Sequence, residues 1–71
     1  MSSLKQLVDK HGFGIRVRAA SKIYVKYPFT IISEAPDDAR SFLVRYDDGR
    51  MYKVLKEFPG CNDYEVVSKE G

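Results

Sequence analysis

The sequence predicts a mainly β domain, α+β by content, in which one short helix precedes about five short antiparallel strands. Two observations predict this class. After Gly14 the spacing of apolar residues changes from the helical period of about 3.6 residues to the strand period of about 2. Turn-forming residues then recur at intervals of roughly eight to twelve residues, which is typical of small barrels and strongly curved sheets.

The size and composition of the chain indicate one small globular domain. Its 71 residues allow a single domain, 1–71, close to the lower limit for a self-sufficient core. We expect a helix over 2–11, a β-rich region over 13–67 and a polar tail over 68–71. A lone cysteine excludes an internal disulfide and a cysteine framework for zinc, and no apolar run is long enough for a signal peptide or a membrane span. We therefore expect a complete small cytoplasmic protein that does not bind membranes.

The helix has recognisable start and stop signals. Ser3 is a suitable N-cap, with Gln6 three residues later in the capping-box position. Gly12 provides a C-cap in the left-handed region. The apolar side chains lie on one face: Leu4, Leu7 and Val8.

The residues that follow predict three strands and the turns between them. Alternation predicts strands over 15–19 and 23–27, each with an apolar and a basic face, joined by a bend at Ala20-Ser21. Pro28 prevents regular central pairing at its own position. A further β-rich run covers 29–34 and ends in the turn 35–38.

Residues 41–56 carry the strongest local signal, two β-rich runs on either side of Asp-Asp-Gly-Arg. Asp48-Gly49 suits a two-residue type I′ turn, which matches the twist of the strands it joins. That register places three pairs opposite each other: Tyr46 with Met51, Arg45 with Tyr52, and Leu43 with Val54. Pro59-Gly60 predicts one more turn, and 64–67 a last strand.

The alternation also predicts which side chains form the core. The expected core residues are Leu4, Leu7, Val8, Ile15, Val17, Ile23, Val25, Ile31, Phe42, Val44, Leu55 and Val66. The two faces of the hairpin are harder to rank, so Leu43 and Val54 are alternatives to some of these.

The segment Val44-Arg45-Tyr46-Asp47-Asp48-Gly49 resembles a hairpin of the SH3-like small barrels, especially those of the Tudor and KOW types. Many of those domains carry a hydrophobic-x-Tyr/Phe-Asp-Asp/x-Gly hairpin in their middle. The similarity extends from Phe29 to Leu55. It implies a five-stranded antiparallel SH3-like small barrel, and a strongly curved sheet is the alternative.

Charge is segregated along the chain, although the formal net charge is only +2. Residues 10–33 contain no carboxylate, and aromatic residues are interleaved with their cations. Residues 34–48 are predominantly acidic. Segregated charge of this kind is typical of binding modules.

The basic and aromatic residues predict nucleic-acid binding, because Lys and Arg neutralise phosphates and aromatic rings stack on bases. Alternation places Arg16 and Arg18 on one outward strand face, with Tyr24 as a stacking partner. The full set of predicted binding residues is Arg16, Arg18, Lys22, Tyr24, Lys26, Arg45, Tyr52 and Lys53. The expected partner is DNA or RNA.

The alternative is an adaptor or regulatory subunit that docks on a larger protein assembly. The aromatic residues are the basis of this hypothesis, because they suit either a cage for a methylated cation or a groove for a Pro-rich segment. The residues considered for it are Tyr24, Tyr27, Phe29, Tyr46, Tyr52 and Asp48. Homo-oligomerisation through a sheet edge is a further option.

We expect no enzymatic activity, no cofactor and no metal site. His11 and Cys61 lie fifty residues apart without an oxyanion-hole motif, so they are not predicted to act as a nucleophilic pair. The Asp37-Asp38 and Asp47-Asp48 doublets lie in predicted turns and lack the spacing of a calcium loop. Gly12-Phe13-Gly14 precedes a strand, whereas dinucleotide fingerprints precede a helix.

Overall fold

The computed structural model describes residues 3–19 and 26–67. These residues form α1 (Leu4–His11), β1 (Ile15–Ala19), β2 (Phe29–Ala35), β3 (Asp38–Tyr46), β4 (Met51–Leu55) and β5 (Asp63–Val66). Parts of the predictions lie outside the described residues: the bend at Ala20-Ser21, residues 23–25 of the second predicted strand, Lys22, Ile23, Tyr24, Val25 and the tail 68–71.

The capping box predicted for α1 is present. The Gln6 N–H donates to Ser3 Oγ (3.2 Å), and the Ser3 N–H donates to Gln6 Oε1 (2.9 Å). Ser3 itself is extended, so α1 begins at Leu4, and residue 2 of the predicted helix lies outside the described residues. Gly12 ends it at φ +82°, with its N–H donating to the Val8 carbonyl at 2.7 Å.

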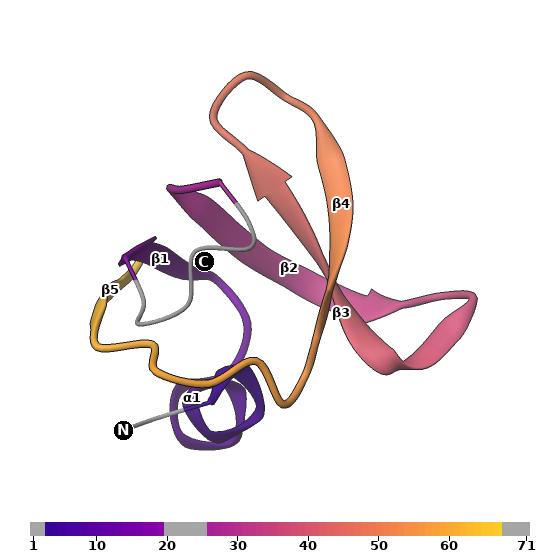
Figure 1. Ribbon diagram of the computed structural model, residues 1–71, viewed down its shortest axis with the longest axis horizontal. Coiled ribbons are helices and arrows are strands. Elements are labelled where there is room, and N and C mark those ends of the chain that lie inside the picture. The colour runs from indigo at the N-terminus through magenta and orange to yellow at the C-terminus, as the bar shows by residue number, and fades with distance from the viewer. Residues whose placement is uncertain (1–2, 20–25, 68–71) are drawn as a thin grey trace.

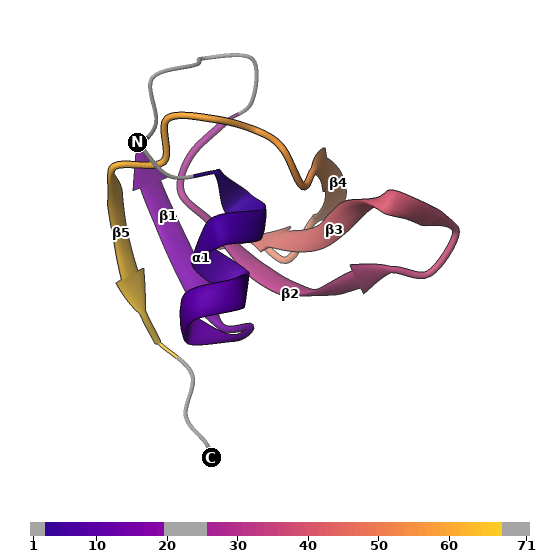
Figure 2. The same ribbon diagram turned by 90° about the horizontal axis from the view of Figure 1, so that it is seen from below.

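The five strands form one antiparallel sheet in the order β4-β3-β2-β1-β5. β2 runs through its middle, with α1 at one end of the molecule (Figures 1 and 2). Register shifts in β2 after Ile31 and before Ala35 bend the sheet, because a bulge increases the local twist. Among the described residues β4 and β5 are the two edges, so the sheet is open. The chain is therefore a small, mainly β domain.

The prediction of a second strand over 23–27 is wrong at its C-terminal end. Lys26 and Tyr27 are outside any strand, and β2 begins at Phe29, directly after Pro28. Pro28 has no backbone N–H with which to continue a sheet ladder, which is why pairing starts only after it.

The β3–β4 hairpin differs from the prediction by one residue. Arg45 pairs with Met51, Val44 with Tyr52, and Phe42 with Val54. The turn contains three residues, 47–49, rather than two, and Gly49 adopts φ +94° at its end. This is the common three-residue hairpin in which a glycine in the left-handed region follows a type I turn.

The core lies between α1 and the inner face of the curved sheet. Its buried residues are Leu4, Leu7, Ile15, Val17, Phe29, Ile31, Phe42, Val44, Val54, Phe58 and Cys61. Val8 is only partly buried. The prediction was wrong for Leu55 and Val66, which are 58% and 47% exposed.

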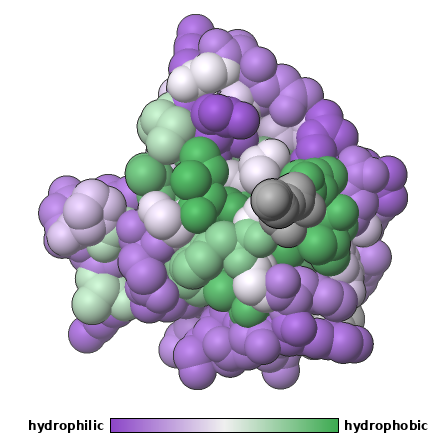
Figure 3. Space-filling model, turned by 180° about the vertical axis from the view of Figure 1, so that it is seen from behind, coloured by the Kyte–Doolittle hydropathy of each residue, from purple (hydrophilic) through white to green (hydrophobic). Residues whose placement is uncertain are grey.

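Both errors have a positional cause. The one-residue shift of the hairpin places Val54, not Leu55, opposite buried Phe42. Val66 lies near the end of the edge strand β5, where β1 covers one side only. On one face of the molecule an apolar area is surrounded by hydrophilic side chains (Figure 3).

Candidate functional site

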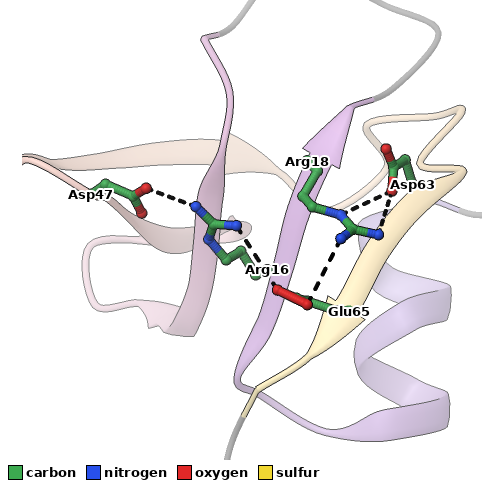
Figure 4. Close-up of polar contacts among 5 residues, drawn as sticks. All are labelled: Arg16, Arg18, Asp47, Asp63 and Glu65. Carbon is green, nitrogen blue, oxygen red and sulfur yellow. Dashed lines mark hydrogen bonds and ion pairs between the residues drawn. The ribbon is translucent and has the colours of Figure 1, made fainter.

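Arg16 on β1 is held by carboxylates of this same chain. Its Nη2 lies 2.7 Å from Asp47 Oδ2 in the β3–β4 turn, and its Nη1 lies 3.9 Å from Glu65 Oε2 on β5. Figure 4 shows the guanidinium between the two acidic side chains. The side chain is only 29% exposed, so little of it faces solvent.

Arg18, two residues further along β1, is held in the same way. Its Nη2 and Nε lie 2.7 and 2.9 Å from Asp63 Oδ1, and its Nη1 lies 3.8 Å from Glu65 Oε1 (Figure 4). We call this group of five side chains the arginine network: Arg16, Arg18, Asp47, Asp63 and Glu65. A phosphate would have to compete with these carboxylates for both guanidinium groups.

The other predicted site residues that the structure describes, Lys26, Arg45, Tyr52 and Lys53, do not extend this face into one basic patch. Arg45 is exposed on the outer side of β3. The Lys53 ammonium contacts Asp37, 3.2 Å from each carboxylate oxygen. Lys26, Tyr52 and Lys53 line a neighbouring cleft, to which Asp47 of the arginine network also contributes.

This cleft has a volume of about 460 Å³. Residues 26–28 and the β3–β4 hairpin line it. Its lining residues are Lys26, Tyr27, Pro28, Tyr46, Asp47, Asp48, Arg50, Tyr52, Lys53 and Val54. It is called the tyrosine cleft below, after Tyr27, Tyr46 and Tyr52.

A chain of aromatic contacts fixes the rings of the tyrosine cleft. Tyr27 stacks on buried Phe29 with ring centroids 5.5 Å apart. Tyr46 meets Phe29 edge to face at 6.1 Å and meets Tyr52 edge to face at 5.1 Å. Offset stacks and edge-to-face contacts are the favourable geometries for such rings. The core therefore supports Tyr27 and Tyr46, and Tyr46 supports the 48% exposed Tyr52.

Two tyrosine hydroxyls of the cleft are harder to ionise than usual. Burial is the main reason that the pKa of Tyr46 is raised, although the backbone N–H of Lys26 opposes it by donating to the hydroxyl. Burial is also the main reason that the pKa of Tyr27 is raised, and the nearby Cys61 and Tyr46 raise it further. Both hydroxyls keep their protons at neutral pH and can act as hydrogen-bond donors.

The carboxylates of the cleft are engaged by arginines. Asp47 accepts from Arg16, and Asp48 Oδ2 lies 3.3 Å from Arg50 Nε. The Lys26 ammonium, in contrast, has no carboxylate of the described residues within ion-pair distance. The cleft thus has an apolar aromatic lining and an available cation at its rim.

Tyr46 and Tyr27 were absent from the predicted nucleic-acid site but present among the aromatic residues considered for protein recognition. Pro28 and Arg50 were assigned to neither. The signal that links Tyr46 to Tyr52 is the Asp-Gly turn between them, since a hairpin brings its flanking strands together.

The groups considered for chemistry have structural roles. Burial raises the pKa of the Cys61 thiol to about 11, which keeps it protonated and unreactive. Asp38 Oδ1 accepts the Arg40 N–H (2.9 Å), and Asp48 Oδ1 accepts the Arg50 N–H (2.9 Å), as is usual for turn aspartates. Residues 3–19 and 26–67 contain no group of three or more His, Cys, Asp or Glu side chains placed to hold a metal ion.

No family model matches the chain, and no curated protein or solved structure shows significant similarity to it. Within the described part of the chain, no helix is long and apolar enough to cross a membrane. The arginine network and the tyrosine cleft are therefore the features of this chain that bear on its function.

Proposed function

We propose that this protein is a non-enzymatic adaptor that binds a segment of a partner protein in the tyrosine cleft. The observation that carries the proposal is Tyr52, a half-exposed ring that the Tyr46 ring holds in place. Tyrosine is enriched among the residues that dominate protein interfaces, because it buries a large area with few rotatable bonds. Aromatic-lined grooves are one of the recurring ways to recognise extended peptides.

The arginine network favours this function over phosphate recognition. Steering toward nucleic acid requires cations whose field is not cancelled nearby, and Asp47, Asp63 and Glu65 cancel that of Arg16 and Arg18. Nucleic-acid binding stays a prediction for Lys26, Tyr52 and Lys53, since a single strand could stack on the same rings. We treat it as an outcome of the test.

We also propose a more specific fold for this mainly β domain, an SH3-like small barrel of the Tudor or KOW type. It is supported by the register shifts that bend β2 and by the position of the Val44–Gly49 hairpin in the middle of the domain.

The test is a selection of peptides from a random phage-displayed library against the wild-type protein, with Tyr52→Ala as counter-selection. Selected peptides are synthesised, and their affinities are measured by fluorescence anisotropy. We expect binding to wild type to be about tenfold or more tighter than to Tyr52→Ala, as for a hot-spot residue. Phe13→Ala is the matched control, because Phe13 is another exposed aromatic residue but lies outside the cleft.

The same measurement is made with single-stranded oligo(dT) and oligo(U) over a range of salt concentrations. We expect no Tyr52-dependent binding of either. Tyr52-dependent oligonucleotide binding that weakens steeply with salt would assign the cleft to nucleic acid and overturn the proposal. So would a selection in which no peptide discriminates wild type from Tyr52→Ala.

A further inference from the structure

β4 is an edge strand, because it pairs only with β3 within the described ranges (Figure 1). Just beyond its two ends, the Arg50 carbonyl accepts from Tyr46 N–H (2.9 Å) and the Lys56 N–H donates to the Arg40 carbonyl (2.9 Å). Hydrogen-bonded and non-bonded pairs alternate along an antiparallel ladder. Tyr52 and Val54, two and four residues after Arg50, therefore direct their backbone groups to β3.

The residues of β4 that alternate with Tyr52 and Val54 direct their backbone N–H and C=O groups to the free edge. These are Met51, Lys53 and Leu55. The Leu55 carbonyl is used locally, accepting the Phe58 N–H at 3.0 Å. An edge of this kind is a template for one more strand.

The free edge of β4 lies next to the tyrosine cleft. Tyr52, Lys53 and Val54 all line the cleft, and Lys26, Tyr27 and Pro28 line it from the other side. A strand added to β4 would alternate its side chains, as every strand does. Those beside Tyr52 and Val54 would enter the cleft, and those beside Met51, Lys53 and Leu55 would lie on the outer face.

The charges along this edge have one sign. Residues 50–56 contain Arg50, Lys53 and Lys56 and no carboxylate. Each cation contacts one carboxylate of the chain, but those partners, Asp48, Asp37 and Glu34, are 58%, 72% and 59% exposed. A single exposed ion pair contributes little, so these cations can exchange their partners for carboxylates of another protein more readily than Arg16 and Arg18, each of which contacts two carboxylates.

We propose that the occupant of the tyrosine cleft is a β-strand of a partner protein that pairs with the free edge of β4. It carries a carboxylate beside Lys53 and apolar residues on either side. The apolar residues match the exposed Met51 and Leu55 on the outer face and Tyr52 in the cleft. Main-chain hydrogen bonds supply affinity in such strand addition, and alternate side chains supply specificity. This inference rests on the proposed function, and it adds the binding mode and the chemistry of the partner.

The first test blocks the edge with Lys53→Pro. Proline at this position removes an N–H that faces away from β3, so it spares the β3–β4 ladder. We expect the selected peptides to lose about tenfold or more in affinity. The matched control is Val66→Pro on β5, the opposite edge of the sheet. The Val67 N–H donates to the Gly14 carbonyl (2.8 Å). Because bonded and non-bonded residues alternate along the ladder, the Val66 N–H faces away from β1, so proline spares this ladder too. It should leave peptide binding unchanged.

The second test reverses the charge with Lys53→Glu, which leaves the backbone intact. The peptide selection is repeated on this variant. We expect selected wild-type ligands to share a carboxylate within an apolar strand-like run, and ligands of the variant to carry Lys or Arg at that place. This specificity change tests the carboxylate beside Lys53 even if Lys53→Pro fails to fold, which amide NMR spectra of the variant would show. In that case selected peptides with N-methylated alternate amides, which cannot donate to β4, should bind more weakly, and unchanged binding would overturn strand addition.

The outcomes separate this inference from the proposed function. Peptides that require Tyr52 but bind Lys53→Pro fully, with no charge preference at Lys53, would overturn strand addition and leave the adaptor function standing. If no peptide requires Tyr52, both fail. Self-association of the wild type that Lys53→Pro abolishes would make a second copy of this chain the occupant and overturn the assignment to another protein.

Discussion

The arginine network and the tyrosine cleft lie on the same small domain and differ in what they leave available. In the network, the charged groups of Arg16 and Arg18 face carboxylates of the same chain. In the cleft, the rings rest on one another, yet the outermost, Tyr52, keeps 48% of its surface exposed. Residue type alone therefore does not identify a site. A partner can use only those groups that the fold itself has not already paired.

The pairing follows from how the sheet brings sequence-distant segments together. The basic stretch 10–33 contributes β1, and the acidic stretch 34–48 ends in the β3–β4 turn. Arg16 from the first and Asp47 from the second come within 2.7 Å of each other. Charge that is segregated along the sequence is therefore interleaved in space.

The largest expected effect comes from removing the ring under the cleft. Phe29→Ala deletes a fully buried side chain on which both Tyr27 and Tyr46 pack. We expect it to lower the free energy of unfolding by about 3–5 kcal/mol, the usual cost for a buried phenylalanine. Chemical denaturation followed by circular dichroism measures the change.

Tyr52→Ala is the comparison for this variant, because Tyr52 is the exposed end of the same aromatic chain. It should cost much less stability than Phe29→Ala while removing ligand binding. Equal losses of stability would contradict the division of the cleft into a supporting ring and a binding ring.

The sequence predicted the elements well and the faces of β4 poorly, for a physical reason. The capping box at Ser3 and the alternation of Ile15 and Val17 on β1 act over a few residues, and both predictions were confirmed. Gly12 ends the helix at a positive φ as predicted, but its ψ of −171° lies outside the left-handed helical region. A hairpin register depends on whether its turn has two or three residues, and Asp-Asp-Gly-Arg suits both. A difference of one residue exchanges the two faces of the strand, so Val54 is buried where Leu55 was expected.

The candidate site was predictable only in its composition. The sequence identified the tyrosines of the cleft and the cations of both surfaces except Arg50. It could not assign Arg16 to Asp47 or Arg18 to Asp63, because those partners lie 31 and 45 residues away in the chain. Long-range ion pairs depend on strand order, and local patterns do not specify that order.

An intermediate effect is expected from releasing the arginines of the network. The triple variant Asp47→Asn, Asp63→Asn and Glu65→Gln removes three negative charges, which raises the formal net charge from +2 to +5. We expect it to bind oligonucleotides at low salt, with an affinity that falls steeply as salt rises, whereas the wild type does not. Fluorescence anisotropy over a salt series measures both.

The control for this variant has the same net charge but leaves the network intact: Asp9→Asn, Glu34→Gln and Glu57→Gln. If it binds oligonucleotides equally well, net charge and not the freed arginines is responsible. Comparable salt-dependent binding by the wild type would show that the carboxylates do not mask Arg16 and Arg18.

The smallest expected effect is a change in folding stability with pH, which should involve the tyrosine cleft and not the arginine network. Burial raises the pKa of Tyr46 above the ordinary 10.0, so above that pH the unfolded chain loses this proton before the folded one does. Folding stability should therefore be insensitive to Tyr46 below about pH 10 and should decline above it, and Tyr46→Phe should reduce the decline. The arginine network consists of ion pairs at the surface, which salt screens, so its contribution should respond to salt instead. Denaturant unfolding of wild type, Tyr46→Phe and Arg16→Ala across pH and salt tests both halves. If Tyr46→Phe changes the salt response, or Arg16→Ala the alkaline response, the two regions are coupled and do not act as separate surfaces.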